Sequence, residues 1–190
     1  MGMRLNKSLQ QLVLVFCYAV GRVVALLILV LLLPVLVALY IASWITLGEQ
    51  PFFSQQRVGL NGRLFRVYKV RTVPSQEGLP IPKLCQSFRL IHVDELPQLL
   101  NIVLGQMAIV GPRPHVPEHV AQYLPWQRNR LKVKPGLTCI RQLLSPKQKL
   151  QFNQHLELDI KYIDTWNPRL DLQILWQSVK MGALYNSWTQ

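Results

Sequence analysis

Two adjacent carboxylates, Asp94 and Glu95, stand almost alone among basic residues. Between residues 50 and 117 the only other acid is Glu77, while the stretch contains eight basic residues. Adjacent carboxylates in such a setting suit phosphoryl transfer, one as nucleophile and the other holding Mg²⁺, while arginine and lysine neutralise phosphate charge. The alternative is structural, because acids in a first helical turn also favour the helix dipole. The eight basic residues are Arg57, Arg63, Arg66, Lys69, Arg71, Lys83, Arg89 and Arg113.

The elements around this pair can be read from local signals. Asp94 is predicted to cap a helix that tolerates Pro97 in its first turn and ends at Gly105. A helix N-terminus there would also favour a bound anion. The expected apolar face of this helix consists of Leu96, Leu99, Leu100 and Val103.

A β-hairpin is predicted just before it, because Asn61-Gly62 separates the strand-like segments 52–58 and 63–70. A loop is expected over 74–82. Two amphipathic helices are predicted over 145–166, capped by Ser145, and over about 167–185, capped by Asn167. Their mixture of Trp and Tyr with Lys and Arg is typical of helices lying on a membrane surface, although packing on the core is an equal alternative.

A long apolar segment precedes all of this. From Leu12 to Ile45 the only charge is Arg22. This apolar run is longer than the hydrophobic part of a cleaved signal peptide and long enough to cross a bilayer. Pro34 lies in its middle and predicts a kink. A bent spanning helix is the simplest interpretation, but basic residues on both sides also favour a re-entrant helix or two short crossings split near Arg22. We place the domain boundary after residue 48, giving a membrane segment (1–48) and a second domain (49–190).

The composition limits the classes of binding partner but does not choose among them. The 190-residue chain has a net charge of +12, which attracts nucleic acid, anionic lipid or a phosphorylated small substrate. Its three cysteines show no metal or disulfide spacing, as expected of small buried side chains in a reducing compartment. His115 and His119 have metal-like spacing, but Pro117 makes a helical ligand pair doubtful.

The order of motifs resembles the bacterial sugar transferase family, the small monotopic polyprenyl-phosphate glycosyl-1-phosphate transferases. The similarity runs from about Arg22 to Trp176. It begins at the Pro34 break and continues with Pro-Phe-Phe-Ser-Gln-Gln-Arg-Val-Gly at 51–59 and Lys-Val-Arg-Thr at 69–72. Then follow Arg89, Asp-Glu-Leu-Pro-Gln-Leu at 94–99 with Asn101, Val-Gly-Pro-Arg-Pro at 110–114, Lys-Pro-Gly-Leu-Thr at 134–138, and Asp159, Tyr162, Trp166 and Asp171.

The resemblance implies an α+β fold: a re-entrant helix broken at Pro34, with a small cytoplasmic domain containing the hairpin and amphipathic interfacial helices. It implies a bacterial inner-membrane location with the catalytic domain on the cytoplasmic face. Asp94 matches the catalytic nucleophile, and Glu95 matches the catalytic residue that binds Mg²⁺. Lys69, Arg89 and Arg113 match basic positions near the phosphates, and we add Arg71 as a phosphate-binding candidate.

The implied reaction moves a sugar-1-phosphate from a nucleotide sugar, UDP-linked by expectation, to polyprenyl (undecaprenyl) phosphate and releases UMP. The expected partners are these two substrates and membrane lipids; a homodimer is left open, and nucleic acid is not expected. Three departures stand out: Leu33 replaces a serine before the proline, Ala25 replaces an early acid, and an Asn-Gly-Arg segment is missing after Thr138. Arg141 or Lys147 are candidate substitutes for the lost arginine. The departures also motivate the alternative of a non-catalytic relative that binds polyprenyl phosphate or scaffolds a glycan pathway.

Overall fold

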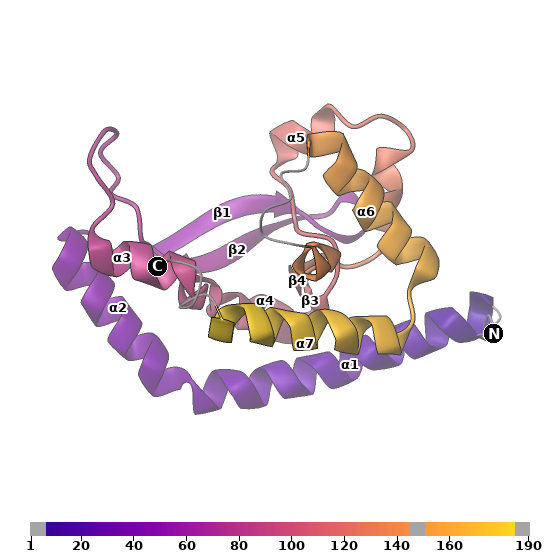
Figure 1. The fold of residues 1–190 in the computed structure, drawn as a ribbon, viewed down its shortest axis with the longest axis horizontal. Coiled ribbons are helices and arrows are strands. Elements are labelled where there is room, and N and C mark those ends of the chain that lie inside the picture. The colour runs from indigo at the N-terminus through magenta and orange to yellow at the C-terminus, as the bar shows by residue number, and fades with distance from the viewer. Residues whose placement is uncertain (1–6, 145–150, 185–190) are drawn as a thin grey trace.

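The N-terminal apolar segment forms two helices that meet at a sharp bend (Figure 1). The computed structural model describes residues 7–144 and 151–184. Helix α1 (Lys7–Leu31) ends just before Leu32, and α2 (Leu33–Leu47) carries Pro34 in its first turn. The predicted kink is therefore confirmed. Its cause is that proline lacks a backbone donor and crowds the preceding turn.

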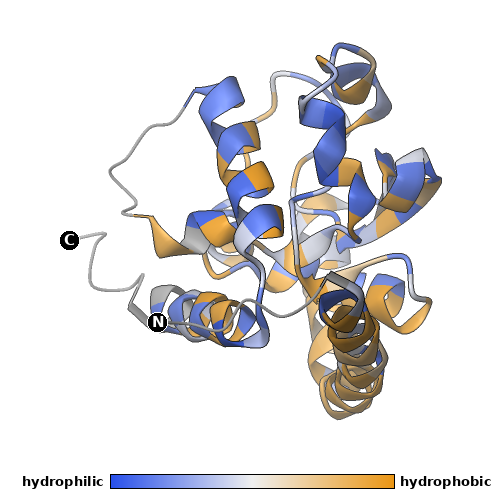
Figure 2. Cartoon of the chain, turned by 90° about the vertical axis from the view of Figure 1, so that its right-hand side faces the viewer, coloured by the Kyte–Doolittle hydropathy of each residue, from blue (hydrophilic) through white to orange (hydrophobic). Residues whose placement is uncertain are grey.

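Both helices pack along the rest of the chain instead of standing away from it. Ala25 of α1 is fully buried in a cluster with Phe65, Ile102 and Met107. The guanidinium of Arg22, the lone charge of the apolar run, donates from Nε to the carbonyl of Val103 at 2.9 Å. The outer faces of α1 and α2 remain apolar and exposed, and the ribbon of this apolar segment is largely orange, that is hydrophobic, in Figure 2.

The predicted hairpin is confirmed. Strands β1 (Phe52–Val58) and β2 (Leu64–Val70) are antiparallel, with Val58 opposite Leu64. Asn61 and Gly62 both have positive φ, and the Arg63 amide donates to the Leu60 carbonyl at 3.1 Å, which is the type I′ geometry that Asn-Gly favours. The second strand begins one residue later than predicted, because this turn lies within a longer loop.

The segment containing the two carboxylates differs from the prediction. After α3 (Lys83–Leu90), Asp94 lies inside a 3₁₀ turn, η2 (Val93–Glu95), and Pro97 takes the cap position of α4 (Gln98–Val103). The prediction that Asp94 caps this helix is therefore wrong. Pro97 has no N–H to donate to the Asp94 carboxylate, and α4 begins only after Pro97. Leu100 is also wrong as a core residue, since this short helix buries a narrow face and leaves Leu100 40% exposed.

A second, parallel strand pair was not predicted from the sequence. Strands β3 (Ala108–Val110) and β4 (Gly136–Thr138) are short and widely separated in the chain. At their ends Gly111 and Gly136 bring two backbones so close that a Cβ on Gly136 would overlap the Gly111 amide. This close approach explains why glycine occupies both positions.

The C-terminal part contains α5 (Pro117–Ala121), the 3₁₀ helices η3 (Gln127–Lys132) and η4 (Ile140–Leu143), α6 (Phe152–Thr165) and α7 (Pro168–Leu184). Asn167 caps α7 as predicted, accepting from the Leu170 amide at 3.0 Å. The cap predicted at Ser145 for the preceding helix is wrong, because Gln151 caps α6 and the helix begins only at Phe152; Ser145 itself lies outside the described residues. In Figures 1 and 2, α7 lies beside α1 at the lower edge of the molecule, and the two helices pack through a shared cluster around Ile174.

The architecture is α+β, with an N-terminal apolar helix that suggests membrane association. Residues Ser8–Leu31 are long and apolar enough to cross a bilayer, and they are the one stretch of the described chain that meets this criterion. Length and composition alone do not distinguish crossing from lying within one leaflet.

Candidate active site

Glu95 is held by two cations that arrive from different elements. Lys69 Nζ, from the end of β2, lies 2.6 Å from Glu95 Oε1, and Arg113 Nη2, from the loop after β3, contacts the same oxygen at 2.6 Å. Burial by itself raises the pKa of the Glu95 carboxyl, but Arg113 and Lys69 outweigh it and lower the pKa to about 2. Glu95 is therefore a fixed carboxylate at neutral pH.

Asp94, its neighbour in the chain, is in a different electrostatic state. It is equally buried, at 8% exposure, yet it accepts no hydrogen bond within the described part of the protein. Burial and the charge of Glu95 raise the pKa of Asp94, while Lys69, Arg89 and His92 partly counter this. The pair thus combines Glu95, whose negative charge is compensated by two cations, with Asp94, whose carboxylate accepts no hydrogen bond from the described residues and has a raised pKa.

The predicted basic residues separate into three groups. Lys69 and Arg113 contact Glu95 directly, and Arg89 lies close enough to Asp94 to affect its charge. The side chain of Arg71 is engaged elsewhere, donating to the Gln50 carbonyl and to Ser75 Oγ. The structure does not bring Arg71 to the pair, and its role in phosphate binding stays a prediction.

Two further residues join the site that sequence reasoning did not select. Arg57 and Gln98 line a small pocket together with Lys69 and Arg113. The guanidinium of Arg57, half-buried, is near enough to Glu95 and Arg113 to interact with their charges. A sequence signal existed for Gln98, since it follows Asp94 by four residues in a predicted helix.

Buried polar side chains fix the backbones that carry Lys69 and Arg113. The Asn101 amide of α4 donates to the Arg66 carbonyl at 2.7 Å, and its oxygen accepts from the Tyr68 amide at 3.2 Å, which ties α4 to β2. The guanidinium of Arg130 donates to the Arg113 carbonyl at 2.7 Å. Arg130 is held in turn by Asp159 of α6 at 2.5 Å, with both side chains less than 5% exposed.

Residues 14–184 match the model of the family described as "Bacterial sugar transferase". The chain belongs to this family. It is 38% identical over 143 residues to a protein of Bacillus subtilis named as an uncharacterized sugar transferase, EpsL, covering 70% of each chain. It is 32% identical over 183 residues to a UDP-glucose:undecaprenyl-phosphate glucose-1-phosphate transferase of Klebsiella pneumoniae, covering 87% of this chain and 39% of that one.

A protein of the same name from Caulobacter vibrioides is 32% identical over 175 residues, which cover 83% of this chain and 66% of the relative. The chain therefore spans less than half the length of the Klebsiella relative and about two thirds of the other two. The polar contacts around Asp94 and Glu95 all lie within the region matched by the sugar transferase model.

The donors at this sugar transferase site fit a magnesium ion. Mg²⁺ prefers oxygen ligands and is commonly held by one or two carboxylates together with substrate phosphates and water. Glu95 uses Oε1 for its cations, and its charge is close enough to act on the Asp94 carboxyl. Within residues 7–144 and 151–184 there is no group of three or more His, Cys, Asp or Glu side chains that would form a closed protein cage.

His115 and His119 form an aromatic cluster rather than a ligand pair. His115 stacks on Phe152, with ring centroids 5.5 Å apart, and its Nδ1 is 2.6 Å from the Tyr123 hydroxyl. Burial, followed by Arg130 and other cations, lowers the pKa of His115 to about 3. The ring is therefore neutral, and because α5 begins at Pro117, His115 lies outside the helix that contains His119, as Pro117 predicted.

Arg141, one candidate substitute for the missing family arginine, makes no hydrogen bond or ion pair with Asp94 or Glu95 among the described residues. Its charge acts instead on Asp159, His155 and His115, on the side of the molecule formed by α6. Lys147, the other candidate substitute, lies outside the described residues. Where the Asn-Gly-Arg segment is missing after Thr138, the nearby Arg141 thus interacts with residues of α6 and with His115.

Proposed function

We propose that this sugar transferase moves a sugar-1-phosphate from a UDP-sugar to undecaprenyl phosphate, releasing UMP. The observation that carries the proposal is the asymmetry of the pair: Glu95 is neutralised by Lys69 and Arg113, while Asp94 is buried beside it and accepts no hydrogen bond from the described residues. The names of the relatives from Klebsiella and Caulobacter support the same substrates.

Asp94 is the proposed nucleophile of a two-step displacement. Its carboxylate oxygen forms a bond to the phosphorus that bears the sugar, the bond from that phosphorus to the bridging oxygen breaks, and UMP leaves with that electron pair. An oxygen of the lipid phosphate then attacks the same phosphorus and displaces Asp94 as a free carboxylate. No base is required, because both the nucleophile and the acceptor are already anions.

The cations of the site neutralise charge on the substrate phosphates. Lys69, Arg113 and Arg57 surround the small pocket beside Glu95, and Arg89 approaches from the Asp94 side. Glu95 is the proposed holder of Mg²⁺, which when bound would supply further neutralisation of the pyrophosphate. Arg130 and Asn101 keep the backbones of Arg113 and of β2 in place.

For the membrane we propose a re-entrant geometry in the inner membrane, with the site on the cytoplasmic face. The support is that α1 packs along its length against the domain, from Leu14 to Leu29, so upright crossing by α1 would draw the domain into the bilayer. Residues 1–48 would then form the membrane segment and 49–190 the catalytic domain. The face of α7 formed by Leu172, Trp176 and Val179, each more than 60% exposed, would lie in the interface.

The test is lipid-dependent release of UMP by the detergent-solubilised protein. With Mg²⁺ and a panel of UDP-sugars, we expect UMP only when undecaprenyl phosphate is present. Asp94→Asn should abolish release, and Glu157→Gln, which removes an exposed carboxylate on α6, should leave it unchanged. Full turnover by Asp94→Asn would remove Asp94 as nucleophile. Lipid binding without turnover by the wild-type protein would favour the non-catalytic relative.

A further inference from the structure

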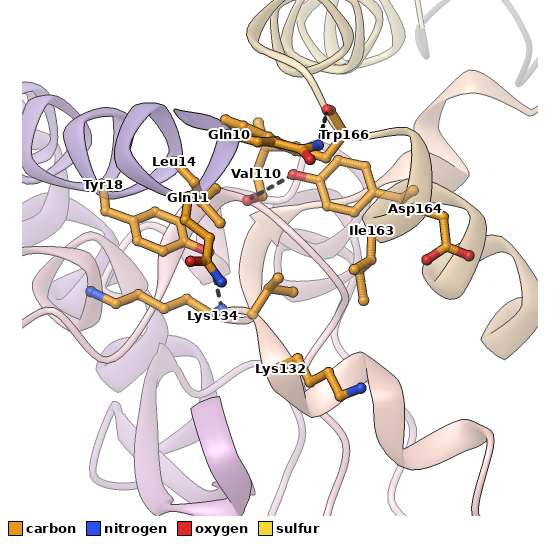
Figure 3. Close-up of a pocket in the computed structure, with 12 residues that line it drawn as sticks. Gln10, Gln11, Leu14, Tyr18, Val110, Lys132, Lys134, Ile163, Asp164 and Trp166 are labelled. Carbon is orange, nitrogen blue, oxygen red and sulfur yellow. Dashed lines mark hydrogen bonds between the residues drawn. The ribbon is translucent and has the colours of Figure 1, made fainter. Parts of the chain in front are cut away.

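A second pocket lies at the N-terminal half of α1, apart from the carboxylate pair. It has a volume of about 420 Å³ and is bounded by α1, by the segment between η3 and β4, and by the end of α6 (Figure 3). None of its lining residues lines the pocket beside Glu95. The transferase reaction proposed above makes no use of this space.

The polar lining of this pocket carries a positive charge. Lys132 and Lys134 are among its lining residues, and Asp164 is the one acid there. Lys134 Nζ lies 4.9 Å from the centre of the Tyr18 ring, and the charge of Arg22 is close enough to affect it. Two cations against one anion favour an anionic ligand, and tyrosine is enriched at membrane–water interfaces.

An apolar groove continues from the pocket along α1. The groove has a volume of about 260 Å³, lies between α1 and α7, and shares Tyr18 and Val110 with the first pocket. Its wall includes Phe16, Val20 and Leu172, and Gly21 provides room at its centre. A cationic pocket that opens into an apolar groove matches a molecule with an anionic head and a hydrocarbon tail.

The position along α1 agrees with this match. Gln10 and Gln11 line the polar pocket, and the apolar run, whose one charge is Arg22, begins at Leu12. The pocket therefore lies where the polar start of α1 gives way to its apolar part. Trp166, whose carbonyl accepts from Gln10 at 2.9 Å, closes the pocket beside the end of α6.

We propose that this pocket and groove bind one anionic phospholipid, with its phosphate in the pocket lined by Lys132 and Lys134 and an acyl chain between α1 and α7. The lipid would attach α1 and α7 to each other and to the bilayer. It is a structural lipid, distinct from the polyprenyl phosphate that is consumed in the reaction. The proposal does not depend on the transferase chemistry.

The test measures binding of phosphatidylglycerol to the delipidated full-length protein by native mass spectrometry. We expect one tightly bound molecule, with weaker binding of phosphatidylcholine and of glycerol 3-phosphate, which lacks the tail. Lys132→Gln/Lys134→Gln should weaken binding about 25-fold, since each basic side chain near an anionic lipid contributes roughly a factor of five. Asp164→Asn should strengthen it, by up to about fivefold.

The matched control is Arg63→Gln/Arg128→Gln, which removes the same charge from two exposed side chains that line neither cavity. It should bind phosphatidylglycerol as the wild type does. Equal loss in the control would reduce the effect to net charge and overturn the proposal, as would displacement of the phospholipid by polyprenyl phosphate or equal affinity for glycerol 3-phosphate. If the double variant fails to fold, Lys132→Gln and Asp164→Asn, both at exposed residues, must still shift affinity in opposite directions.

Discussion

Two buried acids in this protein are paired with arginine, and they serve different ends. In the Glu95 cluster, formed by Glu95, Lys69 and Arg113, two cations share one carboxylate and Arg113 keeps 45% of its side chain exposed. In the Asp159 pair, formed by Asp159 and Arg130, one cation meets one anion and both are almost fully enclosed. The excess of positive charge is thus found where a substrate can reach it.

The electrostatic consequences are opposite. The two cations of the Glu95 cluster lower the pKa of Glu95, whereas burial raises the pKa of Asp159 more than Arg130 and Arg141 can offset. Arg130 Nε and Asp159 Oδ1 also lack partners among the described residues. A fully enclosed pair mainly fixes geometry, while a partly open cluster with surplus cations is prepared for a further anion.

The largest effect on stability is expected from breaking the Asp159 pair. Arg130→Met leaves a buried carboxylate alone and should cost about 3–5 kcal/mol, lowering Tm by roughly 10 °C for a domain of this size. Thermal unfolding in detergent, followed by circular dichroism, measures this. Adding Asp159→Leu should restore much of the loss, and a double variant no more stable than the single one would contradict the assignment.

Removing a cation from the Glu95 cluster should instead affect turnover. Lys69→Met should lower kcat/KM for the UDP-sugar by roughly 10²–10³-fold, as expected when one donor to a developing charge is lost. Tm should change little, because Arg113 still pairs with Glu95. The comparison fails if Lys69→Met unfolds the protein while its turnover per folded molecule is unchanged.

Asn101 shares features of both regions: it is fully buried, like the Asp159 pair, but it orients β2 beside the Glu95 cluster. Asn101→Leu leaves the Tyr68 amide without its acceptor and should cost about 1–3 kcal/mol. Activity should fall with it, by less than in Lys69→Met. Asn101→Asp retains an acceptor for Tyr68 and is the matched variant; it should recover part of the stability, measured in the same unfolding assay.

Arg141 should give the smallest effect. Its charge acts on Asp159 and His155 and not on Asp94 or Glu95, so Arg141→Gln should leave kcat within about twofold of wild type and lower stability by less than about 1 kcal/mol. Steady-state release of UMP is the measurement. A loss comparable to that of Lys69→Met would place Arg141 in the site and erase the distinction between the two regions.

Local features of the fold followed from the sequence. The kink at Pro34, the Asn61-Gly62 turn and the Asn167 cap each depend on one or two residues whose backbone preferences act within a single turn. The cap assigned to Asp94 failed, because Pro97 moved the start of α4 beyond it. The short parallel strands β3 and β4 carried no recognisable local pattern.

The candidate site divides in the same way. By itself the sequence determined the chemistry available, two carboxylates among arginines and lysines, since residue type alone fixes charge and donor count. Tertiary structure decided that Lys69 and Arg113 converge on Glu95, that Arg57 and Gln98 join them, that Arg71 does not, and that Asp94 accepts no hydrogen bond from the described residues. The reason is physical: these residues come from separate segments, and distances between separate segments are set by packing and not by neighbouring residues.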